Sequence, residues 1–372
     1  YALKEDRMVH MLKRLATNEI QEELAYLIEG ALETVEELFD ALYATLGEAE
    51  ITEGVRMYIQ KDDHWLTKIE KLKSQLEHMG DLLVFEHELF TVDIYELNII
   101  DGYLDELVFA MNLLLTQNVI YWLETKDGYM QVIVMPHFIQ DFMEKHVWTQ
   151  HIPYIFSSAT LSNNGNFTYF KKSLGMKDAL QLSVASPYDY EEKMRIIFHI
   201  SDEASRVRKV QEYLEKTKGR TLLLFPTTEQ LKHFKQSFKK SEYEFEILFE
   251  GDQEISSLVS YFQNHESSVL CAEHLWEGLD VPGSSLSQVI IWDLPFPPHD
   301  PVFDSFRRAA DDAFLEVDLP YMLLRIRQGI GRLIRTADDQ GDVVIFFDKD
   351  SYTNYAKYIK DVLPRKVETI QS

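Results

Sequence analysis

Cysteine is nearly absent from this chain of 372 residues, because Cys271 is its single thiol. One thiol excludes disulfides within the chain and any cluster held by several cysteines of these residues. Cys271 lies in the apolar run 268–272, so we expect it in a buried strand. Long apolar runs are missing too: none approaches the ~20 residues that span a membrane. With no visible signal peptide, the sequence predicts a cytoplasmic protein.

A phosphate-binding loop of the Gly-x-x-x-x-Gly-Lys-Ser/Thr type is also lacking. None of the 15 glycines is followed by lysine, the residue that reaches the phosphates in such a loop. A strand that ends in Asp-Glu-Ala-His is absent as well. Segment 196–205 imitates one, but it ends in Asp202-Glu-Ala-Ser205. We expect a helix to begin here, because acidic residues and serine favour a first helical turn.

Positive charge is scarce, with 37 Lys and Arg against 62 Asp and Glu and a net charge of −25. Residues 1–150 carry 11 cations against 29 anions, a net of −18, and the remaining residues carry 26 against 33, a net of −7. Bulk charge of this sign disfavours non-specific nucleic-acid binding. Any contact with nucleic acid must therefore be a local groove.

The whole chain is long enough for two or more domains. Helical periodicity dominates its first third. Apolar residues recur at spacings of three and four with acidic residues between them, and a third helical pattern spans 91–116. The two clearest stripes are Leu24, Ile28, Ala31, Val35, Leu38 and Leu42, and then Trp65, Ile69, Leu72, Leu76 and Met79. These patterns predict long helices that pack together, without catalytic chemistry.

The period then changes to that of strands. Runs 118–124 and 129–135 flank Lys126-Asp-Gly128, which predicts a β-hairpin. A short helix is expected over 138–147. The apolar run Tyr154-Ile-Phe156 predicts a strand that leads into Ser157-Ser-Ala-Thr-Leu161, and the polar residues 163–166 predict a domain boundary.

The second half alternates strands and helices, which predicts an open, mainly parallel α/β sheet with helices on both faces. The expected strands are 220–225, 243–248, 268–272, 288–292 and 342–347, and the expected helices are 228–240, 254–264, 303–314 and 320–335. Ligands of such sheets bind at the carboxyl ends of the strands. There Gly278 could bring the backbone close to a phosphate and Asp280 could accept a hydrogen bond from a sugar hydroxyl, although Gly-x-Asp is also a common turn.

A row of arginines near the end of the chain suggests which ligand is bound. Arg325, Gln328, Arg332 and Arg335 are spaced by three, four and three residues, so on one helix they would share a face. Guanidinium groups suit forked contacts with phosphate oxygens. A solvated, salt-bridged helix face is the alternative.

Four segments together resemble motifs III, IV, V and VI of superfamily 2 helicases, in that order. They are Ser158-Ala-Thr-Leu161, Leu222–Thr227, Trp276–Gly283 and Gln328–Arg335. Their residues are similar to those of the DinG/XPD branch, and so are the segments Tyr121-Trp-Leu-Glu124 and Leu294-Pro-Phe-Pro-Pro298. The resemblance covers roughly residues 118–350.

The resemblance implies a RecA-like, P-loop-NTPase-type parallel sheet domain preceded by a helical, arch-like insertion. Residues 1–117 would be that insertion, 118–162 the last part of the first RecA-like domain with motif III, and 163–372 the second RecA-like domain with motifs IV–VI. The chain would then be a C-terminal portion that lacks motifs I and II. Its first partner would be the N-terminal half of the same polypeptide.

The resemblance also implies roles for single residues. Arg332 and Arg335 would reach the ATP γ-phosphate, Arg335 as the arginine finger, and Gln328 would help to organise that catalytic site. Gly278 and Asp280 would contact nucleotide, and Glu277 would couple them to nucleic acid.

A second set of residues would serve coupling and nucleic-acid binding. Ser158 and Thr160 would link hydrolysis to domain movement. Phe225, Thr227 and Trp276 would lie near bound single-stranded DNA, where aromatic rings can stack on bases. A structural anchor for the loop is the alternative role of Trp276.

The implied activity is that of an ATP-dependent DNA helicase, or DNA-stimulated ATPase, that acts on single-stranded DNA. ATP and Mg²⁺ would be bound mainly by residues absent from this chain, which supplies no metal or iron–sulfur ligands. We therefore expect the chain alone to be inactive. The alternatives are the regulatory region of a DinG-type 3′–5′ exonuclease of Gram-positive bacteria, a non-catalytic module that binds nucleic acid or a partner, and an RNA helicase.

Overall fold

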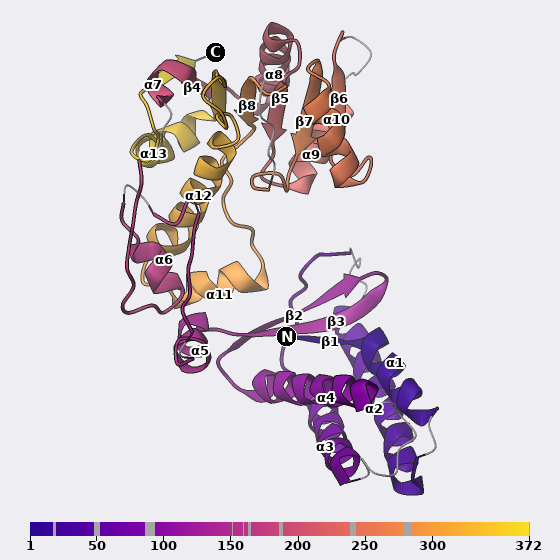
Figure 1. Ribbon diagram of the computed structural model, residues 1–372. Helices are drawn as coiled ribbons and strands as arrows, with labels where there is room; N and C mark the ends of the chain where they lie inside the picture. Colours follow the sequence, from indigo (N-terminus) through magenta and orange to yellow (C-terminus); the bar gives the residue numbers. More distant parts are fainter. Residues whose placement is uncertain are drawn as a thin grey trace. The chain divides into compact units, whose positions relative to one another are not determined.

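In the computed structural model, the chain forms two compact units (Figure 1). The helical unit comprises Tyr1–Ile152, Lys172–Met176 and Pro298–Ala309, and the sheet unit comprises Pro153–Lys171, Lys177–Pro297 and Ala310–Ser372. The structure describes residues 1–17, 20–47, 53–85, 94–150, 152–158, 160–162, 165–185, 189–238, 243–278 and 285–371.

The helical unit confirms the predicted helices. They are α1 (Glu5–Ala16), α2 (Glu22–Leu46), α3 (Asp63–Phe85) and α4 (Ile94–Leu115), with α2 packed on α1 and α3, and α3 on α4. Every residue of the two predicted apolar stripes is buried in one core. Spacing alone therefore identified the packing faces, because a stripe of this period must find apolar neighbours.

A β-hairpin completes the helical unit, as predicted. Strands β2 (Val119–Lys126) and β3 (Tyr129–Pro136) pair antiparallel, and β1 (Ala2–Lys4) adds to β3. Asp127 and Gly128 have φ values of 54° and 81°, the positive values of a two-residue hairpin turn. Helix α5 (Ile139–His146) follows. The hairpin shares the helical core, whereas residues 153–162 belong to the sheet unit, so the predicted 118–162 domain is split.

The sheet unit contains a parallel sheet of seven described strands in the order β10-β4-β9-β8-β5-β7-β6. The strands are β4 (Met194–Ile200), β5 (Thr221–Leu224), β6 (Glu246–Phe249), β7 (Ser268–Ala272), β8 (Gln288–Ile291), β9 (Gly341–Phe347) and β10 (Val367–Gln371). All five predicted strands are present, and Cys271 is buried in β7. The sequence segment of β4 was considered only as an imitation of another motif, and β10 was missed because its four last residues are exposed.

Helices cover both faces of the sheet, as predicted. Residues of α8 (Glu203–Thr217) and α9 (Thr228–Ser237) pack on one side, and residues of α10 (Ile255–Asn264), α12 (Leu319–Ile330) and α13 (Lys349–Lys360) pack on the other. Asp202 caps α8 by accepting a hydrogen bond from the Ser205 N–H at 2.8 Å, which confirms the predicted helix start. Short helices α6 (Thr168–Ser173) and α7 (Tyr190–Lys193) and the π-helical turn Phe314–Asp318 complete the unit.

One prediction about the chain between these elements is wrong. Residues 154–156 form no strand, and the Ile155 side chain is 92% exposed. A strand needs a neighbour for its backbone hydrogen bonds, and an apolar run does not specify that neighbour. The helix expected over 303–314 is present as α11 (Pro301–Ala309), but it ends earlier and belongs to the helical unit.

Candidate functional site

Helix α12 ends earlier than the arginine row requires. Its last residue is Ile330, and the Gly331 N–H donates to the Arg327 carbonyl at 3.0 Å. Arg332 and Arg335 therefore lie beyond the helix, so the prediction of one continuous helical stripe is wrong. Glycines at 329 and 331 explain the early end, because each lowers helix stability by about 1 kcal/mol relative to alanine.

Gly329 lies where α12 packs closely on the sheet. A Cβ at this position would lie 3.0 Å from Leu224 Cδ1 and 3.2 Å from the Trp276 ring. Any larger residue would therefore have to push these side chains aside by a few tenths of an ångström. This close packing sets the distance of α12, which carries Gln328, from the end of β5.

The segment after α12 has a defined geometry of its own. Asp339 is 5% exposed, and its Oδ2 accepts the backbone N–H groups of Arg335 and Thr336 at 2.8 and 2.7 Å. The Arg332 Nε donates to the Gln328 carbonyl at 3.2 Å. The backbone at Arg335 is thus held by a buried carboxylate rather than by helix periodicity, whereas the Arg332 N–H donates to the Gly329 carbonyl at 3.2 Å.

The predicted motif V and VI segments meet in the sheet unit. Gln328 Nε2 donates to Glu277 Oε2 at 2.9 Å across 51 residues of sequence. Beside them the Arg325 guanidinium lies 5.7 Å from the centre of the Trp276 ring, and its Nε donates to the Tyr321 hydroxyl at 3.2 Å. The loop after β7 is therefore tied to α12 by a hydrogen bond and a cation–π contact.

Gly278 has a backbone reason to be glycine. Its φ is 78°, in the left-handed region, and a Cβ there would meet no described atom within 4 Å. The position thus needs the conformational freedom of glycine rather than space for a neighbour. Asp280, with the rest of 279–284, lies outside the described residues.

Arg327 connects α12 to the predicted motif III segment, and sequence reasoning missed it. Its Nη1 donates to the Ser162 carbonyl at 2.9 Å, and burial lowers the pKa of its guanidinium. In that segment the Ser158 and Thr160 hydroxyls lie 3.1 Å apart, and the Thr160 N–H donates to Ser158 Oγ at 3.2 Å. The only sequence feature that could have pointed to Arg327 is its position next to motif VI, outside the spacing of Arg325, Gln328, Arg332 and Arg335.

Two aromatic residues predicted to lie near nucleic acid are buried. Trp276 is 1% exposed and Phe225 is fully buried, and the Trp276 Nε1 donates to the Phe225 carbonyl at 3.3 Å. Neither ring can stack on a base in this arrangement, so that expectation is corrected and Trp276 is a structural anchor. Thr227 is exposed at the start of α9, where its hydroxyl accepts the Gln230 N–H at 3.2 Å.

A partly buried charge pair lies at the carboxyl end of β8, and no local sequence pattern predicts it. The Arg206 side chain is 4% exposed, its Nη1 donates to the Trp292 carbonyl at 3.0 Å, and the same atom is 3.7 Å from Asp293 Oδ2. Gln230 donates to that oxygen at 3.2 Å. Burial raises the pKa of Asp293, and the Arg206 charge opposes this rise. The pair joins α8 and α9 to the chain that leaves β8.

A second polar cluster joins the ends of β6 and β7. His274 Nδ1 lies 2.8 Å from Glu250 Oε1 and 2.9 Å from Glu273 Oε2. Hydrogen bonds to these carboxylates raise the pKa of His274 to about 10, so the ring is protonated at neutral pH. Thr228 donates to Glu273 at 3.1 Å, which adds the start of α9 to the cluster.

Within the described ranges, no group of three or more His, Cys, Asp and Glu side chains is arranged to hold a metal ion. Guanidinium and amide groups, which suit phosphate, are the main functional groups of motif VI. None of the described helices is both long enough and apolar enough to pass through a membrane.

Comparisons with known proteins agree with this arrangement. Residues 210–366 match the family model of the helicase C-terminal domain. The probable ATP-dependent helicase YpvA of Bacillus subtilis is 44% identical over 98% of this chain and 57% of its own length. The ATP-dependent DNA helicase YoaA of Escherichia coli is 30% identical over 60% of this chain and 37% of its own length. The 3′-5′ exonuclease DinG of Bacillus subtilis is 30% identical over 56% of this chain and 25% of its own length.

The chain thus spans well under two thirds of the length of these curated relatives. Among solved structures, an XPD helicase matches with a TM-score of 0.54 and 16% identity, over 99% of this chain and 65% of that one. This likeness shows the fold, and it confirms the predicted parallel sheet with a helical region ahead of it.

Proposed function

We propose that this chain, whose residues 210–366 match the family model of the helicase C-terminal domain and which is similar to the ATP-dependent DNA helicase YoaA, supplies motifs III–VI and one wall of an ATP site. The observation that carries the proposal is the 2.9 Å hydrogen bond from Gln328 to Glu277. It joins two motif segments whose order along the chain was predictable but whose contact in the fold was not. A helicase domain needs such a junction to link nucleotide to nucleic acid.

The phosphate end of this wall is formed by Arg332 and Arg335. Bound ATP supplies the phosphoryl group that is transferred to water, and the two guanidiniums stabilise the charge that develops on it. Asp339 holds the backbone of Arg335 through a hydrogen bond of 2.8 Å, so the point from which this side chain extends is fixed before ATP binds. We propose that Mg²⁺ and most of the nucleotide are held by residues outside this chain, because a loop that serves phosphate and Mg²⁺ is lacking here.

Coupling to single-stranded DNA runs through the loops at the strand ends. We assign nucleotide contacts to Gly278 and Asp280, and coupling to Glu277. Thr227 is the exposed group beside the strand track. Ser158 and Thr160 act through Arg327, which ties their segment to α12 at 2.9 Å.

Phosphate release measured with and without single-stranded DNA tests this proposal. The full-length protein is expected to hydrolyse ATP faster when DNA is present, whereas residues 1–372 alone should show no turnover. The chain alone lacks a phosphate-binding loop, since none of its 15 glycines precedes lysine. DNA-stimulated turnover by the chain alone, or none by the full-length protein, would contradict the proposal.

A regulatory role in a nuclease is the second candidate, because one relative is named a 3′-5′ exonuclease. The same preparations, incubated with ATP and a partial duplex whose shorter strand carries a 5′ label, distinguish the two roles. Progressive shortening of the strand with little duplex unwinding would favour the nuclease. Strand displacement without shortening would favour the helicase.

A further inference from the structure

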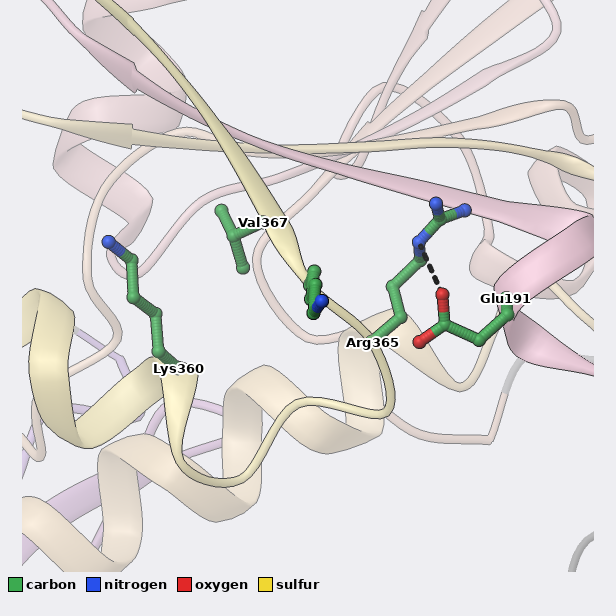
Figure 2. Close-up of a pocket in the computed structure, with 5 residues that line it drawn as sticks. Glu191, Lys360, Arg365 and Val367 are labelled. Atoms are coloured by element: carbon green, nitrogen blue, oxygen red, sulfur yellow. Dashed lines mark ion pairs between the residues drawn. The ribbon is translucent and has the colours of Figure 1, made fainter.

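A hollow of about 530 Å³ in the sheet unit is lined mainly by cations (Figure 2). Its lining residues, called here the cationic hollow, are Glu191, Lys360, Arg365, Lys366 and Val367. Three cations face one carboxylate in a chain whose net charge is −25. Cations that lie this close together repel one another unless an anion lies between them, and a cluster of cations is unexpected in so acidic a chain.

The cations of the hollow are only partly neutralised by protein groups. Glu191 Oε2 lies 3.9 Å from Arg365 Nε, and that buried nitrogen has no hydrogen-bond acceptor. Lys360 Nζ donates to the Tyr352 hydroxyl at 3.3 Å and lies over the Tyr352 and Phe198 rings. Within the described part of the chain, neither Lys360 nor Lys366 has a carboxylate in ion-pair range. The hollow therefore retains positive charge.

Strand β10 adds no negative charge on the side of the cationic hollow. Val367 begins β10, and side chains alternate along a strand, so Glu368 lies on the opposite face from Val367. Figure 2 shows Lys360 and Arg365 on either side of Val367, with Glu191 beside Arg365 alone. An anion of more than one charged group could span both sides.

The cationic hollow is separate from the strand-end motifs. It lies at the amino-terminal ends of β4 and β10, whereas Thr227, Glu277 and Asp293 follow the carboxyl ends of their strands. Its nearest link to motif VI is α7, which carries Glu191 and whose Lys193 donates to the Ala337 carbonyl. Nucleotide in the proposed ATP site therefore does not account for it.

We propose that the cationic hollow is a second anion site, which binds a ligand bearing phosphate groups. Lysine ammonium groups are donors that phosphate oxygens take, and the Arg365 guanidinium, anchored by its Nη1 on the Met194 carbonyl, adds its positive charge. The phosphates can belong to a small polyphosphate or to the backbone of a nucleic acid. This proposal does not depend on the proposed ATPase.

Titration of residues 1–372 with inorganic pyrophosphate, followed by calorimetry, tests the site. The double variant Lys360→Gln/Lys366→Gln is expected to bind pyrophosphate at least about tenfold more weakly, because two charge-assisted contacts are removed. Lys357→Gln is the matched control, since Lys357 is exposed on the same helix and does not line the hollow. Its affinity for pyrophosphate should equal that of the unchanged chain. Equal circular dichroism spectra and melting temperatures would show that all three proteins are folded.

Fluorescence anisotropy of a labelled oligothymidylate distinguishes the two sources of phosphate. A parallel loss of oligonucleotide affinity in the double variant assigns the hollow to the nucleic-acid backbone, and unchanged affinity assigns it to a small polyphosphate. Absence of pyrophosphate binding to the unchanged chain would overturn the proposal. So would equal affinity in the unchanged chain and the double variant.

Discussion

Arg335→Ala in the full-length protein is expected to lower ATP turnover by about 1,000-fold or more, the effect of removing an arginine finger. Nucleotide affinity should change little, because most contacts to ATP would come from residues outside this chain. The loss falls on turnover because the guanidinium meets charge that develops during phosphoryl transfer. Single-turnover hydrolysis and equilibrium binding of a fluorescent ATP analogue measure the two quantities separately.

Two further variants sharpen this test. Arg335→Lys keeps the charge but not the forked geometry, so it should restore only part of the turnover. Arg208→Ala is the control, because the Arg208 side chain is 71% exposed on α8, where it forms an ion pair with Glu212 of the same helix. Turnover by Arg335→Ala equal to that of Arg208→Ala would remove the arginine-finger assignment.

Trp276→Ala is expected to destabilise the sheet unit by about 3–5 kcal/mol, the usual cost of deleting a buried aromatic side chain. The indole is 1% exposed, packs against Gly329 and donates to the Phe225 carbonyl. Trp276→Phe keeps most of the apolar volume and should cost less than half as much. Urea unfolding of residues 1–372, followed by circular dichroism, measures these differences.

A further variant separates an anchor from a stacking platform. If Trp276 is an anchor, Trp276→Leu, which keeps apolar volume but cannot stack on a base, should leave the affinity of the folded full-length protein for single-stranded DNA unchanged. Tyr26→Ala serves as the aromatic control, because Tyr26 is 80% exposed in the helical unit. Unchanged stability of Trp276→Ala, together with a loss of DNA affinity, would restore the stacking role.

Periodicity and turn chemistry made much of the fold predictable. The apolar stripes of α2 and α3, the Asp127-Gly128 turn and the strands of the central sheet follow from local rules. Edge strand β10 escaped prediction because four of its five residues are exposed. Segment 154–156 was overpredicted because an apolar run does not reveal whether a pairing strand exists.

The candidate site was predictable in its order but not in its contacts. Four motif segments gave the order of the site along the chain, and the bond from Gln328 to Glu277 brings two of them together. The end of α12 at Ile330 depends on Gly329 and Gly331, which lower helix stability but do not by themselves mark the residue at which a helix ends. Arg206 with Asp293, and Arg327 with Ser162, are tertiary contacts between residues far apart in sequence, and no local pattern marks them.

Chemical protection of the motif VI arginines tests the central claim most directly. The full-length protein, bound to single-stranded DNA, would be treated with phenylglyoxal in the presence or absence of a non-hydrolysable ATP analogue. Peptide mass spectrometry would then report the modification of each arginine. Nucleotide should protect Arg332 and Arg335 several-fold and leave exposed Arg208 equally modified. Equal modification of Arg332 and Arg335 with and without nucleotide would contradict the assignment of these arginines to the γ-phosphate.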